Sequence, residues 1–333
     1  MSPQMDSKPL RLSLGPFQGI TDVYYRNLFK RYFSGIDKFY TPFFTGVYKA
    51  GGRRMGSVEI DPGLNDVNSL TPQILSRDAD EIILFGNECQ KLGYKEVNWN
   101  LGCPYPRVAN KKRGSGLLPH PEMVVDIMDK LKNSLPLPLS VKCRLGYSGL
   151  HEIDALIPSF NQYPLSELIV HARLGKQLYK GRVYPDQFAR LAPQVKTCLV
   201  YNGDVFSNQI LNEFRMLFPD IRYWMLGRGL LADPFLALDI KGHDGPVMKD
   251  RKDIVYHFMT DLYLQRLKNS NNRPGSLGKM KELWSYLAWS FSDPATAWRL
   301  IRKASGFESY ESAVSKVFSS MEWLGRGFSA KIH

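Results

Sequence analysis

Short apolar runs recur through the first two thirds of the chain and predict strands at 11–15, 38–44, 68–75, 96–101, 139–144, 167–171, 197–202 and 222–226. Between most of them, apolar residues follow the i, i+3, i+4, i+7 spacing of helices with one buried face, at 78–92, 121–131 and 207–218. Ser76 or Asp78 is suited to cap the first of these helices and Ser207 the last. Strands that alternate with helices in this way predict a parallel (β/α)8 TIM barrel, with an open doubly wound sheet as the alternative.

Polar residues at the carboxyl ends of the strands favour the barrel, because there they would converge on one mouth. In the run 139–144, Lys142 and Arg144 share one face of the strand, whereas Cys143 lies on the other. His171 and Arg173 alternate with apolar neighbours in the same manner. If the apolar faces pack against the outer helices, the cationic side chains point into the barrel.

From about residue 251 the pattern contains helices only, at 253–267, 278–291, 294–304 and 308–324. The pair Asp293-Pro294 fits a helix start, with proline at the first helical position. We therefore expect a catalytic barrel in residues 1–245 and a small all-helical C-terminal domain in residues 246–333.

The chain is strongly basic, and this favours a polyanionic partner, with nucleic acid ahead of a membrane surface. Lys and Arg number 44 against 32 Asp and Glu, a net charge of +12. The cations lie in clusters, and Tyr40, Phe43, Phe44, Tyr48, Tyr105, Tyr179 and Tyr184 lie near several of them: Lys49/Arg53/Arg54, Arg107/Lys111/Lys112/Arg113, Arg173/Lys176/Lys180/Arg182 and Lys279/Lys281. Cations for phosphates and rings for unstacked bases are typical of an RNA-binding surface.

The remaining composition excludes several classes. No apolar stretch approaches the roughly 20 residues of a membrane span, and the polar N-terminus lacks a signal peptide's apolar core, so we expect a cytoplasmic protein. The cysteines Cys89, Cys103, Cys143 and Cys198 are far apart, which argues against a metal site and against disulfides. All but Cys103 are expected in the core. A monomer is the expected state.

The run Asn98-Trp99-Asn100-Leu101-Gly102-Cys103-Pro104 is the strongest sign of chemistry. It predicts a buried strand that carries two amides on one face and ends in a constrained turn with a thiol. Cys103 fits three roles: a nucleophile, a structural thiol or a general acid. With an ordinary pKa of about 8.5, a thiol is mostly protonated at neutral pH and can donate a proton. His171 is a second candidate for the proton or for binding an anion.

Two glycine-bearing turns, Asn202-Gly203-Asp204 and Gly227-Arg228-Gly229, follow the last two predicted strands. This is where barrels usually bind phosphate, and Arg228 could add a bidentate contact. Lys142 in a barrel mouth calls for an anion or an electron-rich ring. It fits either a reduced flavin mononucleotide or a Schiff base with a sugar phosphate. Gln73 and Asn100 are suitable amide partners for a flavin or uracil edge.

Together these segments resemble the tRNA-dihydrouridine synthases of the bacterial type. The matching pieces are Gly15-Pro16-Phe17-Gln18-Gly19-Ile20-Thr21-Asp22, Gln73, Asn100-Leu101-Gly102-Cys103-Pro104, Lys142-Cys143-Arg144-Leu145-Gly146, His171-Ala172-Arg173, Asn202-Gly203-Asp204 and Gly227-Arg228-Gly229. The C-terminal helices fit the family's tRNA-binding domain in position and length. Phe17 stands where the family often has Met.

The resemblance implies an FMN enzyme, reduced by NADPH, that reduces the C5=C6 bond of a uridine in tRNA. By that match Cys103 protonates C5 while flavin N5 delivers hydride to C6. The implied FMN-binding residues are Pro16, Phe17, Gln18, Gln73, Lys142, His171, Asn202, Gly203, Asp204, Gly227 and Arg228. Asn100 and either Arg144 or Arg173 would hold the uracil, which must leave the tRNA stack to reach the barrel mouth.

Two other functions remain open at this point. A flavin barrel acting on a free pyrimidine such as dihydroorotate would share FMN and the cysteine, but would not need a basic, aromatic surface. A non-catalytic RNA-binding barrel would be colourless when purified, whereas the enzyme should carry yellow flavin.

Overall fold

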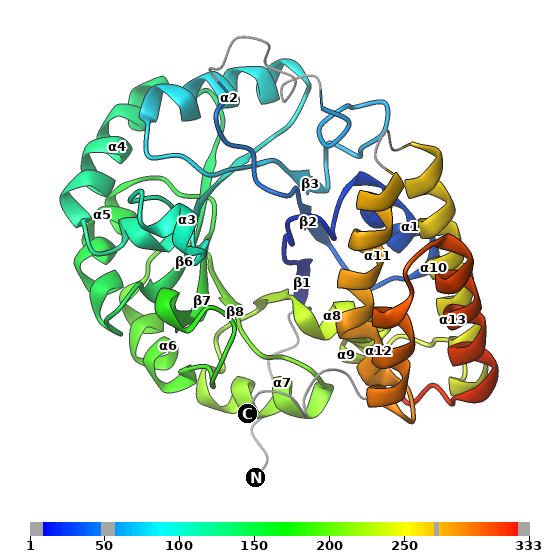
Figure 1. Ribbon diagram of the computed structural model, residues 1–333. Coiled ribbons are helices and arrows are strands. Elements are labelled where there is room, and N and C mark those ends of the chain that lie inside the picture. The colour runs from blue at the N-terminus through cyan, green and yellow to red at the C-terminus, as the bar shows by residue number, and fades with distance from the viewer. Residues whose placement is uncertain (1–8, 48–56, 270–272, 326–333) are drawn as a thin grey trace.

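Nine parallel strands enclose a central space in the computed structural model, which describes residues 9–47, 57–269 and 273–325 (Figure 1). They are β1 (Arg11–Leu14), β2 (Lys38–Tyr40), β3 (Leu70–Thr71), β4 (Gln73–Ile74), β5 (Val97–Leu101), β6 (Leu139–Gly146), β7 (Leu168–Leu174), β8 (Leu199–Asn202) and β9 (Tyr223–Leu226). Their order in the sheet is β3-β2-β1-β9-β8-β7-β6-β5-β4. Each predicted run overlaps one of these strands, except that 68–75 contains both β3 and β4; β6 and β7 continue beyond the predicted ends at 144 and 171.

Pro72 divides this predicted strand in two. β3 pairs with β2, and β4 pairs with β5, so the two ends of the sheet are separated in the chain by Pro72 alone. Proline has no backbone N–H and cannot continue a strand ladder. A parallel bridge between Phe44 and Ile74 adds a further link across this gap. The nine strands therefore occupy the eight positions of a TIM barrel, and the predicted fold class is confirmed.

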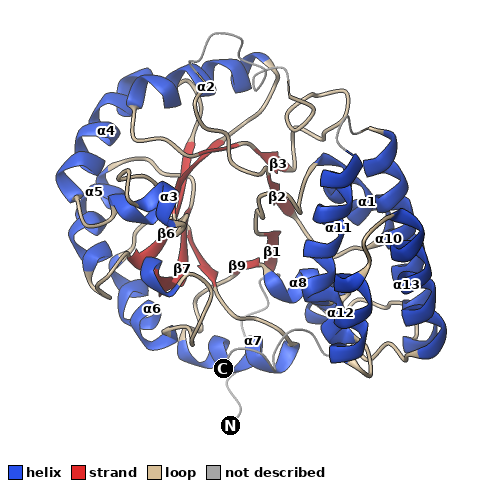
Figure 2. Ribbon diagram, in the orientation of Figure 1, coloured by secondary structure: helices blue, strands red, loops and turns tan. Residues whose placement is uncertain are grey.

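Helices form a ring outside the strands (Figure 2). The barrel part contains α1 (Val23–Tyr32), α2 (Ala79–Lys91), α3 (Pro106–Ala109), α4 (Pro121–Ser134), α5 (Ile157–Gln162), α6 (Pro185–Leu191), α7 (Asn208–Leu217), α8 (Arg228–Ala232) and α9 (Leu236–Lys241), with short 3-10 turns between some of them. Asp78 and Ser207 cap α2 and α7, because their side chains accept backbone N–H bonds within the first turn. Helix α1 is absent from the sequence prediction, since the buried Arg26 interrupts its apolar face.

The C-terminal helices α10 (Met248–Lys268), α11 (Arg273–Leu287), α12 (Pro294–Lys303) and α13 (Phe307–Ser320) lie together on one side of the barrel, beside α1 and α8 (Figure 1). As predicted, α12 begins at Pro294, and Asp293 caps it. Helices α10 and α11 begin earlier than the apolar spacing indicates. The first turn of α10 includes exposed Met248 and Asp250, so it carries no buried stripe from which its start could be recognised.

Two apolar cores lie on opposite sides of the strands. The large outer core fills the space between the strands and the helices and continues into the C-terminal helices; Cys89 and Cys143 are buried in it, as predicted. A small inner cluster of Tyr40, Ile169, Val200 and Met225 fills the barrel interior, and half-buried Cys198 packs against it. The polar strand ends therefore lie above an apolar floor. No helix among the described residues has the length and apolar content that crossing a membrane requires.

Candidate active site

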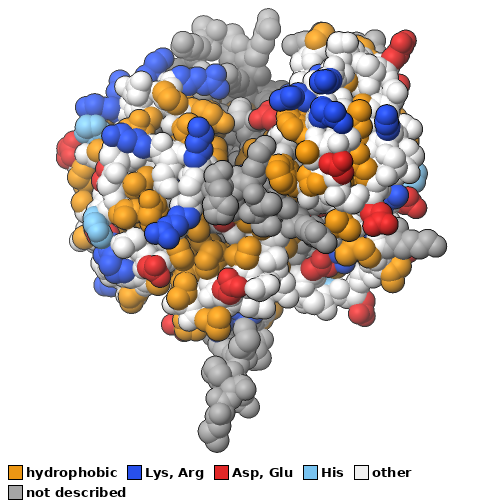
Figure 3. Space-filling view, turned by 60° about the horizontal axis from the view of Figure 1, so that its bottom comes forward, with side chains coloured by type: hydrophobic (Ala, Val, Ile, Leu, Met, Phe, Trp, Pro, Cys, Tyr) orange, Lys and Arg blue, Asp and Glu red, His pale blue; other side chains and the backbone are white. Residues whose placement is uncertain are grey.

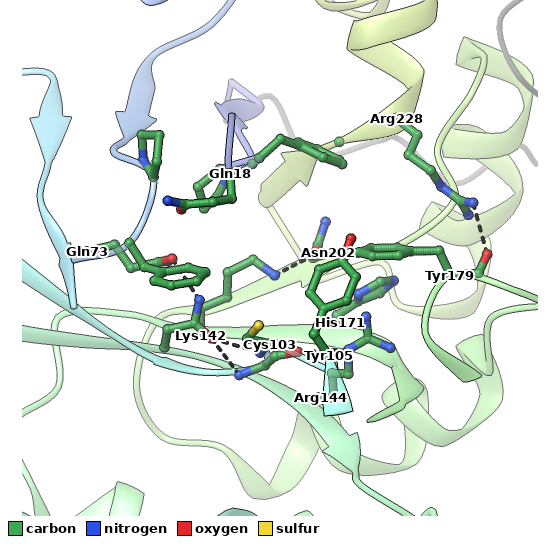
Figure 4. A pocket seen from close by; sticks show the side chains of 18 of the residues that line it. Gln18, Gln73, Cys103, Tyr105, Lys142, Arg144, His171, Tyr179, Asn202 and Arg228 are labelled. Atoms are coloured by element: carbon green, nitrogen blue, oxygen red, sulfur yellow. Dashed lines mark hydrogen bonds between the residues drawn. The ribbon is translucent and has the colours of Figure 1, made fainter. Parts of the chain in front are cut away.

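A cavity of about 970 Å³, including its open mouth, lies at the carboxyl ends of the strands. Nearly all the residues that sequence reasoning selected line it: Pro16, Phe17, Gln18, Gln73, Asn100, Cys103, Lys142, Arg144, His171, Asn202, Gly203, Asp204, Gly227 and Arg228. In Figure 4, Cys103 and Lys142 point into a space that Gln18 and Arg228 border on the opposite side. Arg173 is absent from the wall.

A chain of buried amides positions the end of β5. The Asn98 side chain donates to the Ser140 hydroxyl at 2.8 Å and accepts from the Gln73 amide at 2.7 Å. Asn100 in turn donates to the Gln73 side-chain oxygen at 2.8 Å. These bonds link three adjacent strands inside the barrel. Because each amide both donates and accepts, none of the three can rotate without breaking a buried hydrogen bond.

The Cys103 backbone is held from two sides. Its N–H and that of Gly102 donate to the Asn100 side-chain oxygen at 2.8 and 2.9 Å. Its carbonyl accepts from the Ser115 N–H at 3.0 Å and from the Ser115 hydroxyl at 3.1 Å. Gly114 has a φ of +56°, and a Cβ there would lie 2.6 Å from the Cys103 carbonyl oxygen. Only glycine fits this close approach, so the segment after α3 fixes the turn that carries the thiol.

The Cys103 thiol is only 7% exposed, and burial raises its pKa above the ordinary value although Arg144, Arg107 and Lys142 act in the opposite direction. The thiol is therefore protonated at neutral pH. A raised pKa disfavours the nucleophile, which needs a thiolate, and favours the general acid.

Lys142 lies inside the barrel, where its ammonium donates to the Asn202 side-chain oxygen at 2.9 Å. Burial first, and the Arg144 charge second, lower the pKa of Lys142 to about 8. The pKa of His171 is lowered well below its usual value by burial and by the surrounding cations, with Arg144 and Lys142 foremost. His171 is therefore a neutral imidazole at neutral pH, able to donate or accept a hydrogen bond but not to hold an anion by charge.

Arg144 ties together the loops that follow β5 and β7. Its Nε donates to the Gly102 carbonyl at 3.0 Å, and its Nη1 donates to the carbonyls of Leu174 and Leu178, each at 2.7 Å. Its guanidinium carbon lies 5.3 Å from the centre of the Tyr179 ring. Burial lowers the pKa of Arg144 to about 10, so it remains a cation beside Cys103.

Asp204 joins the two other arginines. Arg173 contacts both carboxylate oxygens of Asp204 at 2.6 Å, and Arg228 contacts one of them at 2.6 Å. Arg173 is fully buried behind the wall and also donates to the Gly181 carbonyl. It thus positions Asp204 and Arg228 rather than reaching the cavity. Together these three side chains carry a net positive charge beside the glycine-bearing turns after β8 and β9, where barrels usually bind phosphate.

Six lining side chains were not selected as site residues from the sequence: Pro42, Phe43, Tyr105, Tyr179, Glu282 and Tyr286. Glu282 and Tyr286 come from α11, far along the chain from every barrel strand, and the Tyr286 ring packs edge-on against Phe17 with centroids 6.0 Å apart. The i, i+4 spacing that places them on one helix face was the one available signal, but it does not reveal what that face meets.

The predicted basic clusters lie in different places. Lys49, Arg53 and Arg54 fall outside the described residues. The side chains of Arg107, Lys111, Lys112, Lys176, Lys180, Arg182 and Lys279 are exposed, whereas Arg173 is buried. Figure 3 shows Lys and Arg side chains in small groups over both the barrel and the C-terminal helical side of this view.

Three comparisons place the chain among known proteins. The family model described as dihydrouridine synthase matches residues 13–322. A tRNA-dihydrouridine(16) synthase of Neisseria meningitidis serogroup B is 29% identical over 282 residues, which is 82% of this chain and 84% of that protein. A probable tRNA-dihydrouridine synthase of Staphylococcus aureus is 26% identical over 238 residues, 67% and 69% of the two chains. Histamine dehydrogenase from Rhizobium has a similar fold, with a TM-score of 0.53 and 9% identity over 75% of this chain and 49% of its own.

Proposed function

The chain belongs to the dihydrouridine synthase family, a family of oxidoreductases. From this premise we propose that it binds FMN and, with NADPH as reductant, reduces the C5=C6 bond of a uridine in tRNA, with Cys103 as the proton donor. The observation that carries the proposal is that a protonated thiol and the ammonium of Lys142 face one cavity at the barrel mouth.

The residues that line the cavity suit both the phosphate and the ring system of FMN. The turns at Gly203 and Gly227 suit a phosphate, with the net positive group of Arg173, Asp204 and Arg228 beside them. Lys142 lines the same cavity and would stabilise negative charge on a reduced ring system. Gln73 supplies an amide edge close to the same point. Bound FMN would supply the hydride for C6.

The chain's own residues supply the rest of the reaction. Cys103 gives its thiol proton to C5 as the double bond is lost, and the resulting thiolate is then reprotonated from solvent. Arg144, a cation on the cavity wall beside Cys103, stabilises negative charge that develops on a uracil oxygen. Of the two arginines expected for the uracil, Arg144 is therefore the proposed one, because Arg173 does not line the cavity. The Asn100 amide donates one of its two hydrogens to Gln73, and the other is proposed to bind the same base.

We propose the C-terminal helices, residues 246–333, as the tRNA-binding domain and residues 1–245 as the catalytic barrel. Exposed Lys279, Arg302 and Lys303 on these helices, with exposed Arg107 and Lys111 beyond Cys103, provide cations on both sides of the cavity. The names of the Neisseria relatives favour uridine 16 as the target position.

The test is direct. The purified protein is expected to be yellow and, with NADPH, to form dihydrouridine in an unmodified tRNA transcript, which nucleoside mass spectrometry and site mapping detect. Cys103→Ala should keep the colour and lose the product. A colourless protein that binds RNA would support the non-catalytic barrel instead. Turnover of free uridine or dihydroorotate as fast as tRNA would support the small-pyrimidine enzyme.

A further inference from the structure

Besides Asp204, which is paired with two arginines, a second carboxylate lines this cavity. Glu282 lies on α11 one turn before Tyr286, and both residues line the cavity. The Glu282 side chain is exposed, and the residues that the structure describes give its carboxylate no hydrogen bond or ion pair. A Cβ on Gly19 would lie 3.6 Å from one of its oxygens, so the carboxylate lies beside the loop that carries Phe17 and Gln18.

The two cations whose charges act on Glu282, Arg266 and Lys279, also contact another carboxylate. Arg266 is buried and contacts Asp22 at 3.2 Å and the Ile20 carbonyl at 2.5 Å, and Lys279 contacts the same Asp22 oxygen at 3.4 Å. Across the mouth, the negative charge of Glu282 is felt by Tyr105, whose pKa is raised by burial first and by Glu282 second. Tyr105 follows Cys103 by two residues, and Glu282 lines the same cavity as both of them.

A free carboxylate is unfavourable where RNA must approach, because it repels phosphate and weakens binding to every RNA alike. It is favourable only where it accepts a hydrogen bond from a neutral RNA donor, and the donors available are the ribose 2′-hydroxyl and base N–H groups. We propose that Glu282 accepts such a hydrogen bond at the extruded uridine or a neighbouring nucleotide, and thereby determines which uridine is presented to Cys103. This inference rests on the proposed tRNA substrate.

Two substitutions separate charge from hydrogen bonding. Glu282→Gln removes the charge but keeps one acceptor oxygen, whereas Glu282→Met removes both at similar size. Glu308→Gln is the matched control, because Glu308 is an exposed carboxylate on α13, another of the C-terminal helices, and does not line the cavity. For each holoenzyme, kcat and KM for substrate tRNA, the Kd for a non-substrate single-stranded RNA, the flavin absorbance spectrum and the map of modified uridines are measured.

Glu282→Met should lower kcat/KM for the target uridine at least tenfold, bind the non-substrate RNA as tightly as wild type or tighter, and form dihydrouridine at additional uridines. Glu282→Gln should lie between Glu282→Met and wild type. The flavin spectrum should stay unchanged. Glu308→Gln should leave kcat/KM within twofold. Equal effects of Glu282→Met and Glu308→Gln, or a rise in kcat/KM for Glu282→Met, would overturn the proposal.

Transcripts that carry a 2′-deoxyribose at the target uridine or its neighbours identify the donor. If the donor is the 2′-hydroxyl, deoxy substitution should weaken the wild type but not Glu282→Met, a coupling that a double-mutant cycle measures. If the donor is a base N–H, the coupling should instead appear on changing the neighbouring base or on methylating N3 of the uridine. Absence of coupling in every arm would also overturn the proposal. A wild type that forms no dihydrouridine would instead contradict the proposed function, so the two failures are distinguishable.

Discussion

Replacing Asp204 by asparagine should strongly destabilise the protein, because this carboxylate is the main partner of a fully buried charge. Arg173 is 0% exposed, and it forms two 2.6 Å bonds to Asp204 besides one to the Gly181 carbonyl. Removing one partner of a buried ion pair costs about 3–5 kcal/mol, since the other charge stays buried without compensation. Arg228 adds less to this cost, because it keeps a 3.0 Å bond to the Tyr179 carbonyl.

The assay is equilibrium unfolding in urea, followed by tryptophan fluorescence, with and without excess FMN so that lost cofactor affinity is separated from lost stability. Asp204→Asn should lower the free energy of unfolding by about 3–5 kcal/mol without FMN. The double variant Arg173→Met with Asp204→Leu should be more stable than Asp204→Asn, because it removes both charges. A loss below about 1 kcal/mol for Asp204→Asn, or a double variant less stable than the single one, would refute the account of a buried, compensated pair.

Four further outcomes are expected. Cys103→Ala should slow dihydrouridine formation about 10²- to 10⁴-fold, the usual value of a general acid, while reduction of the flavin by NADPH, followed by absorbance, keeps its rate. Because burial lowers the pKa of Lys142 to about 8, single-turnover uridine reduction should slow as the pH rises through 8, and Lys142→Met should show no such limb in its pH profile. Gly114→Ala, whose Cβ would meet the Cys103 carbonyl, should cut activity at least tenfold. Gly93→Ala, which has a φ of +88° but nothing within 4 Å, should cost only about 1 kcal/mol of stability and keep activity. Burial raises the pKa of Asp233 to about 7, so the folded state holds a proton that the unfolded state releases near pH 4. The stability that this bound proton contributes should be lost as the pH rises to 7. Urea unfolding of Asp233→Asn should therefore depend less on pH than unfolding of the wild type.

The alternation of residues along strands was enough to orient most of the site. Because successive side chains on a strand point to opposite faces, Lys142 and Cys143 must lie on opposite sides of the barrel wall, and the structure places them so. The end of β5 likewise had to present Cys103 at the mouth, since all strands of a parallel barrel end there. These are local rules that any chain with this pattern obeys.

Alternation could not tell Arg144 from Arg173. The pattern predicts both on inward faces, but Arg144 lines the cavity, whereas Arg173 lies behind it and pairs with Asp204. The register between β6 and β7 shifts after Arg144, and a long side chain can reach several partners from one backbone position. The partner that each arginine binds depends on where the loops after other strands supply a carboxylate or a carbonyl.

The sequence by itself therefore determined the barrel, the inward-facing strand ends and the thiol at the mouth, because these follow from the spacing of neighbouring residues. Only the tertiary structure decided that α11 completes the cavity, that Glu282 stands at its rim, and that Asp204 compensates two arginines at once. Each of these joins residues far apart in the chain. Such contacts are fixed by how helices and loops pack on the finished barrel, and no local periodicity encodes them.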